Sequence, residues 1–205
     1  MLGKILRVYH TIKYLKFKQI IWRIYSFFPR FIFFNNQFPK IKAIKFEGVS
    51  KKGITQDYTE FTFLNETHHL AENGWDNKSL SKLWRYNLHY FDFLLQKSEN
   101  LDIIKKQKNL ITSWISENPF GNGTGWEPYP TSMRIINWIK WNNKTNALTD
   151  SAILSLWNQI RWLASRPEFH LLGNHLFVNA KALLFGCAIF RSDEKSPIYK
   201  KALNI

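Results

Sequence analysis

Apolar residues recur at helical spacing through the last two thirds of the chain. From residue 79 onward, leucine, isoleucine, tryptophan and phenylalanine return every three or four residues, which is the period of an α-helix that buries one face. The pattern predicts helices at about residues 79–95, 103–115, 132–141, 149–164 and 174–190, with a short terminal piece after Pro197. Thr131 or Ser132 is expected to cap the third of these helices. Thr149 or Asp150 is expected to cap the fourth.

The first 78 residues follow other patterns. Residues 1–30 place isoleucine and aromatic side chains at helix-like intervals among cations, which predicts a basic amphipathic helix that ends near Pro29. Two short β-branched or aromatic runs, at 41–49 and 58–64, are bounded by glycine and asparagine and predict a small strand pair or an extended linker. The expected domains are therefore a basic helix at 1–30, an extended or β region at 31–78, and a helical domain at 79–205.

The helical domain sets the expected fold class, which is all-α. Helices of about ten to twenty residues joined by short loops form antiparallel pairs, and such pairs build bundles, solenoids or α/α toroids. No strict sequence repeat favours a solenoid. Aromatic residues make up 17% of the chain, so aromatic packing rather than a valine and isoleucine sheet is expected to fill the core.

Positive charge is concentrated at the start of the chain. Residues 1–53 contain twelve lysines and arginines against one acid, Glu47, within a formal net charge of +14 for the whole chain. Such a field attracts nucleic acid, anionic lipid or acidic polysaccharide without selecting among them. The codon bias of an AT-rich genome would also produce many lysines. Because no nucleic-acid-binding motif accompanies the charge, we expect no nucleic-acid partner. Two interpretations of the basic N-terminal helix stay open: peripheral contact with a membrane surface, and packing against a partner domain.

Cysteine and histidine usage excludes several kinds of site. Cys187 is the only cysteine, so an intrachain disulfide and a cysteine-based metal site are excluded, and its apolar neighbours indicate a small core residue. His68 and His69 lack an evident third ligand, so we expect no metal and no cofactor. Lysines and Arg23 interrupt every apolar run in the first thirty residues. No signal peptide is therefore evident, which favours a cytoplasmic or membrane-peripheral location.

Three segments in order carry a resemblance to a known family. They are residues 83–92 (LWRYNLHYFD), 126–132 (WEPYPTS) followed by Arg134, and 173–176 (GNHL) leading into 179–183 (NAKAL). Together they resemble the heparinase II/III family of bacterial polysaccharide lyases, over about residues 60–190. The resemblance implies an N-terminal α/α toroid and a C-terminal antiparallel β domain. It also implies that an acidic polysaccharide, such as a glycosaminoglycan, binds between the two.

The same resemblance implies a chemistry. Members of this family cleave glycans of uronic acids by β-elimination. Hydrogen bonds neutralise the sugar carboxylate, a base removes the adjacent proton, and an acid protonates the leaving oxygen. Asn174 and His175 match the pair to which carboxylate neutralisation is assigned, and the histidine is also a candidate base. The alternative is structural, with Asn174 as a helix cap and His175 merely solvated.

The second segment supplies candidate substrate-binding residues around a rigid Pro-Tyr-Pro turn. The candidates are Trp126, Glu127, Tyr129 and Arg134. Arginine can grip a sugar carboxylate with two parallel hydrogen bonds, and aromatic rings offer flat faces for pyranoses. In the alternative, Trp126 belongs to the core and Arg134 pairs with Glu127.

The first segment adds three more candidates for the same cleft, Tyr86, Asn87 and His89. They lie among further aromatic residues at helical spacing, which is also the typical pattern of a helix that packs on both sides. A binding role and a packing role therefore both remain open for them.

The chain departs from the family pattern in two ways. The catalytic tyrosine and a further histidine of the family belong to later segments, and Val178 stands where an acidic residue is frequent. We therefore expect a lyase fragment that is inactive alone and lacks its partner β domain. Two alternatives remain. One is a non-catalytic module that binds acidic glycans through its basic helix, and the other is an α/α-toroid glycoside hydrolase with Asp92 and Glu127 as its carboxylates.

Overall fold

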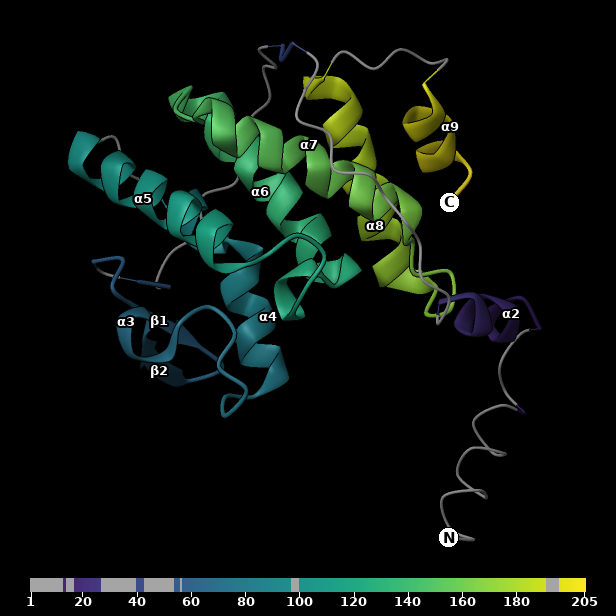
Figure 1. Cartoon of the computed structure of the whole chain (residues 1–205), viewed down its shortest axis with the longest axis horizontal. Helices are drawn as coiled ribbons and strands as arrows, with labels where there is room; N and C mark the ends of the chain where they lie inside the picture. Colours follow the sequence, from purple (N-terminus) through teal and green to yellow (C-terminus); the bar gives the residue numbers. More distant parts are fainter. Residues whose placement is uncertain are drawn as a thin grey trace, which may run out of the picture.

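The chain is mostly helical, as its sequence pattern predicts (Figure 1). The computed structural model describes residues 13, 17–26, 40–42, 54–55, 57–96, 100–190 and 196–205. Within this part of the chain a single two-stranded sheet accompanies the helices. The all-α class is therefore confirmed. None of the helices in the described ranges is both long and apolar enough to cross a membrane.

The order of elements divides the chain into a short N-terminal helix, a small hairpin region and a helical body. The first two parts are α2 (Phe17–Ser26), β1 (Glu60–Phe63), β2 (Glu66–His69) and α3 (Leu70–Asn73). The body contains α4 (Lys82–Tyr90), the 3-10 turn η1 (Asp92–Leu95), α5 (Leu101–Glu117), η2 (Thr124–Trp126), α6 (Pro128–Thr145), α7 (Asp150–Ser165), α8 (Gly173–Ile189) and α9 (Pro197–Leu203).

The hairpin pairs two neighbouring segments. The run at 58–64 contains β1, as predicted, but its antiparallel partner is β2, with Phe63 opposite Glu66. Residues 43–49 of the other predicted strand lie outside the described residues. Leu64 and Asn65 form the turn with φ values of 55° and 62°, the left-handed conformation that two-residue hairpins need. Phe61 and Phe63 point into the core, and Trp84 of α4 donates from Nε1 to the Glu66 carbonyl at 3.1 Å.

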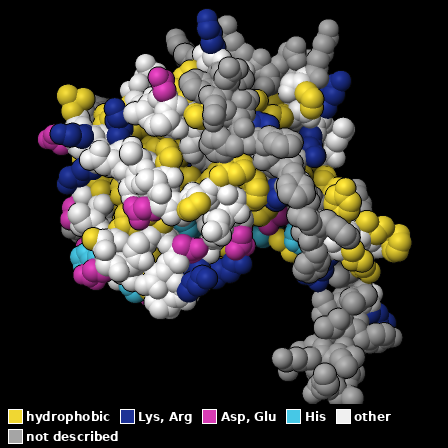
Figure 2. Space-filling model, viewed as in Figure 1, with side chains coloured by type: hydrophobic (Ala, Val, Ile, Leu, Met, Phe, Trp, Pro, Cys, Tyr) yellow, Lys and Arg dark blue, Asp and Glu magenta, His cyan; other side chains and the backbone are white. Residues whose placement is uncertain are grey.

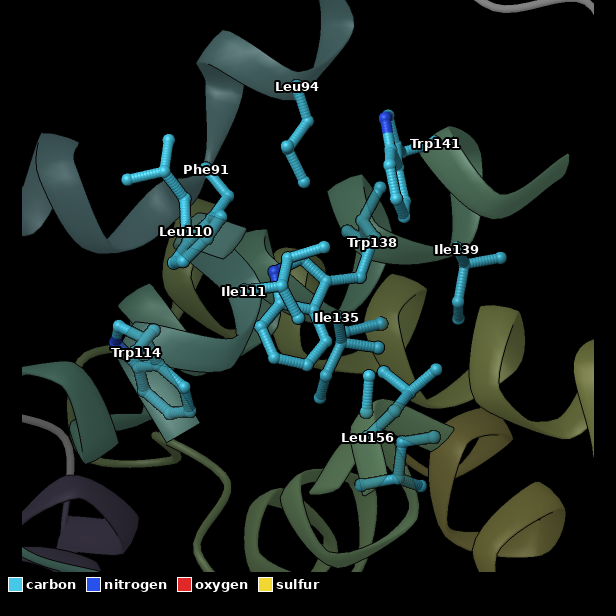
Figure 3. Close-up of a cluster of buried hydrophobic side chains, with 14 of the residues drawn as sticks. Phe91, Leu94, Leu110, Ile111, Trp114, Ile135, Trp138, Ile139, Trp141 and Leu156 are labelled. Atoms are coloured by element: carbon cyan, nitrogen blue, oxygen red, sulfur yellow. The ribbon is translucent and has the colours of Figure 1, made fainter. Parts of the chain in front are cut away.

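Helices of the body alternate between two layers. In one layer α4 contacts α6 and α6 contacts α8, while in the other α5 contacts α7 and α7 contacts α9. Large aromatic and aliphatic side chains fill the space between the layers, and Trp114, Ile135 and Trp138 meet there with almost no exposed surface (Figure 3). Cys187 is buried, as its apolar neighbours in the sequence indicate.

The first and third predicted helices have other boundaries in the structure, and the predicted cap of the fourth is confirmed. The first predicted helix breaks at Phe91, whose φ of 59° ends α4 before η1 begins. The third starts earlier than predicted, because Pro128 occupies the first helical position, where its fixed φ favours initiation. Thr131 and Ser132 are therefore not caps and lie buried in that helix. Thr149 does cap α7, since its Oγ1 accepts from the Ala152 amide at 3.3 Å.

Gly186 sets the spacing between α7 and α8. A Cβ atom on Gly186 would lie 2.7 Å from Cδ1 and 2.9 Å from Cγ1 of Ile160. Alanine is the better helix former by about 1 kcal/mol, but the overlap forces the helices apart or distorts Ile160, at a cost of about 1–3 kcal/mol. We expect Gly186→Ala to lower the free energy of unfolding by about 1 kcal/mol in denaturant titrations. A more stable variant would show that the two helices separate without cost.

Candidate functional site

Four elements bring polar and aromatic side chains together at one end of the layer that contains α4, α6 and α8. The first turns of α6 and α8 lie at this lower end in Figure 1. We call the group the tyrosine–histidine cluster. Its members are Tyr86 and Tyr90 of α4, Glu127 and Tyr129 at the start of α6, Glu168 in the loop after α7, and His175 of α8.

Tyr86 anchors one side of this cluster through Glu127. Its Oη donates to Oε2 of Glu127, and Nζ of Lys82 lies 2.9 Å from the same oxygen. Burial, and then the hydrogen bond and the charge of Glu127, raise the pKa of Tyr86. Burial likewise raises the pKa of Tyr90. Both phenols therefore stay protonated, which makes them hydrogen-bond donors and excludes them as bases.

Aromatic rings run continuously from α4 to α8. The ring centroids of Tyr86 and Tyr90 are 6.3 Å apart, and those of Tyr90 and Tyr129 are 5.7 Å apart. The ring of Tyr129 then lies 4.6 Å from that of His175. The Pro-Tyr-Pro turn gives this order, because Pro128 starts the helix and directs Tyr129 from its first turn towards both neighbours. Flat rings in series are suited to packing against sugar rings.

A hydrogen-bonded network around Glu168 orients the ring of His175. Nδ1 of His175 lies 3.3 Å from Oε1 of Glu168, whose other oxygen accepts from Nδ2 of Asn179 at 3.2 Å. The Asn179 amide also donates to Oγ of Ser132 at 3.0 Å, and its Oδ1 accepts from the Glu168 backbone amide at 2.8 Å. Burial raises the pKa of Glu168, and the positive charge of His175 opposes this rise. These contacts hold the His175 ring in one orientation beside Glu168.

The start of α8 offers further polar groups beside His175. Leu172 occupies the N-cap position and makes no side-chain capping bond, so no side chain of the cap satisfies the first amides of the helix. Asn174 is exposed and lies inside the helix, so it is not the cap that the structural alternative required. The His175 side chain is 40% exposed, against 9% for Glu168. An anion can therefore reach His175 and the helix start from solvent.

Four predicted site residues do not join this surface. His89 and Trp126 are buried in the core, where Nδ1 of His89 accepts from Trp114 Nε1 at 3.0 Å and Trp126 Nε1 donates to the Asn118 carbonyl at 3.2 Å. Asn87 is half-buried and donates to the Leu83 carbonyl of its own helix at 2.8 Å. The packing interpretation is correct for His89 and Trp126, because their helical faces turn inward.

Arg134 is the fourth, and its predicted role as a carboxylate grip is wrong. The side chain has no exposed surface, and its guanidinium carbon lies 3.8 Å from the centre of the Trp114 ring. Its Nε donates to Gln159 Oε1 at 2.9 Å and its Nη1 to the Gly125 carbonyl at 2.8 Å. The alternative pairing with Glu127 is not seen either, since the contacts of Arg134 lie in the core. Its partners Trp114 and Gln159 belong to α5 and α7.

Asp92, the first carboxylate of the hydrolase alternative, is likewise part of the core. It is buried and accepts from Nδ2 of Asn137 at 2.7 Å. The carboxylate that does reach the cluster with Glu127 is Glu168, which the sequence did not single out. Asn179, which donates to Glu168, and Ser132, which accepts from Asn179, were also missed. Asn179 stands four residues after His175, a spacing that places the two on one helical face.

Among the residues that the structure describes, no group of three histidine, cysteine or acidic side chains could hold a metal ion. Comparisons with family models, with curated proteins and with solved structures find no match to this chain.

Proposed function

We propose that this chain binds the carboxylate of a uronic-acid glycan at the tyrosine–histidine cluster, as the substrate-binding part of a polysaccharide lyase that acts by β-elimination. The observation that carries this proposal is the accessible His175 ring beside the uncapped start of α8 and against Tyr129. The alternating layers, with α4, α6 and α8 on one side, support an α/α-toroid arrangement. The three segments of family resemblance also meet here.

The contacts suit a sugar carboxylate at this position. The amides at the start of α8 and the partial positive charge of the helix terminus favour an anion. His175 adds a hydrogen bond through Nε2 while Nδ1 is turned to Glu168. Asn174, exposed in the same turn, provides an amide for the second oxygen. Neutralising the carboxylate in this way acidifies the adjacent carbon-bound proton, which is the step that β-elimination needs.

Bond making and breaking then follow from that acidity. A base takes the proton next to the carboxylate, the electron pair forms a carbon–carbon double bond, and the glycosidic oxygen leaves and takes up a proton. His175 can fill only one of two roles here: with a proton on Nε2 it donates to the carboxylate, and without that proton the same nitrogen acts as the base. Tyr86, whose hydroxyl proton is donated to Glu127, offers its ring for stacking on a sugar, and Tyr90, whose pKa is raised by burial, is protonated and can donate a hydrogen bond.

We expect the chain to bind short uronic-acid oligosaccharides and to lose this binding when His175 is changed. Isothermal titration should give an affinity for the acidic sugar at least about tenfold higher than for the same sugar with its carboxyls reduced to alcohols. His175→Gln should weaken binding of the acidic sugar by about tenfold or more, because the imidazole donor beside the carboxylate is lost. Ultraviolet absorbance of the same mixtures of protein and sugar shows whether unsaturated uronate products form, and so whether the chain also cleaves the sugar.

The matched control is His69→Gln, on the exposed strand β2. It should bind like the unchanged chain. Equal binding of the acidic and reduced sugars would contradict recognition of a carboxylate. Binding that survives His175→Gln but disappears when residues 1–30 are removed would favour the basic N-terminal segment as the glycan site.

A glycoside hydrolase is the second candidate, and one observation favours it. The charge of Glu127 contributes to raising the pKa of Glu168, so two carboxylates influence each other across the cluster. Glycosidases use such a pair, with the more easily protonated carboxyl as the acid. The products separate the two chemistries, because hydrolysis leaves saturated ends and β-elimination leaves unsaturated ends. Saturated products whose formation is lost in Glu168→Gln would establish the hydrolase and overturn the lyase.

A further inference from the structure

Helix α2 carries an apolar face that the described residues leave in solvent. Phe17, Ile21, Ile24 and Tyr25 are 76%, 47%, 57% and 54% exposed. They stand at positions i, i+4, i+7 and i+8, so they share one side of the helix. In Figure 2 hydrophobic side chains gather on the outer side of the molecule where α2 lies. We call these four residues the outer face of α2.

The opposite side of α2 attaches the helix to the body. The Trp22 ring stacks on Phe169 with a centroid distance of 4.5 Å, and Nε2 of Gln19 donates to the His170 carbonyl at 3.2 Å. Both contacts fall on the loop between α7 and α8. The helix is therefore held with one side against the protein, which leaves the outer face pointing away from it.

Charge in the sequence that contains this helix has one sign. The first 46 residues contain ten lysines and arginines and no aspartate or glutamate, with Glu47 as the first acid. A helix with an apolar face among cations is the type that lies in the headgroup region of anionic bilayers. A second copy of this chain would bring the same positive charge to the same face, and the repulsion would oppose association.

From these observations we propose that the outer face of α2 binds the surface of an anionic lipid membrane. The apolar side chains enter the boundary between headgroups and acyl chains, and the surrounding cations contact anionic headgroups. Ten residues are too few to cross a bilayer, so the helix lies along its surface. The proposal is independent of any glycan site, because it uses neither the tyrosine–histidine cluster nor its residues.

Vesicle co-sedimentation of the whole chain tests this surface. Binding to vesicles that contain phosphatidylglycerol should exceed binding to pure phosphatidylcholine vesicles by about tenfold or more, and should fall as salt is raised. The double variant Ile21→Gln, Ile24→Gln keeps the charge and changes only the apolar face. We expect it to lose about tenfold in partitioning to the anionic vesicles.

The matched control is Leu101→Gln, which also removes an exposed apolar side chain, one that is 80% exposed. It starts α5, on the far side of the molecule from α2 in Figure 1, and should bind vesicles like the unchanged chain. If the double variant binds as well as the unchanged chain, charge alone is responsible and the proposal fails. It also fails if neither vesicle binds, or if light scattering shows that the outer face joins two copies in solution.

Discussion

Replacing Arg134 by alanine is expected to lower the free energy of unfolding by about 3–5 kcal/mol. The guanidinium group donates to Gln159 Oε1 and to the Gly125 carbonyl, so its removal leaves the buried Gln159 oxygen without this donor and the Gly125 carbonyl with Thr131 Oγ1 alone, at 3.2 Å. The side chain also lies on the Trp114 ring, so its loss leaves a cavity in the core. Urea titration monitored by circular dichroism measures the change.

Lys105→Ala is the control for this substitution. It removes the same charge from an exposed position of α5, so it should change stability by no more than about 0.5 kcal/mol. Arg134→Lys keeps the charge but not the planar group that spans several acceptors, and should recover only part of the loss. A variant Arg134→Ala that unfolds within about 1 kcal/mol of the unchanged chain would show that water or a shifted side chain replaces these bonds.

Helix positions were predictable from the sequence because tryptophan, leucine and isoleucine repeat with the period of the faces they bury. Residues 103–115 and 149–164 lie within or beside α5 and α7, and Thr149 caps α7 as expected. The break at Phe91 was not predictable from that period. A phenylalanine with a positive φ is rare, and here the rings of Trp75 and Trp114 hold it in the core.

The candidate site was predicted in part. Tyr86, Glu127, Tyr129 and His175 were named from three segments of the sequence, and the structure brings these four together. Glu168 was missed because it follows Pro167 in a loop, where no periodicity assigns a side chain to a face. The prediction of a binding role for Arg134 was wrong because charged residues are seldom fully buried, which made an exposed position the natural expectation. Only the folded chain reveals the acceptors that surround this side chain in the core.

Acid should destabilise the protein through His89 at a pH well above the range of ordinary carboxylates. Burial lowers the pKa of His89 from 6.5 to about 3, and the positive charges of Arg134 and Arg85 add to this effect while Asp76 opposes it. Below pH 6.5 the unfolded chain binds a proton that the folded chain does not accept until about pH 3. The free energy of unfolding therefore falls as pH falls, by about 1.4 kcal/mol for each pH unit.

Comparison of His89→Gln with the unchanged chain isolates this contribution. The variant has no proton to bind at residue 89, so between pH 6.5 and about pH 4.5 it should lose about 2 kcal/mol less than the parent. Lost packing lowers the stability of the variant by the same amount at every pH. The test is therefore the change in the free energy of unfolding with pH, not its absolute value. Parallel pH profiles for His89→Gln and the parent would mean that His89 takes up its proton in the folded state, with Trp114 Nε1 turned away from Nδ1.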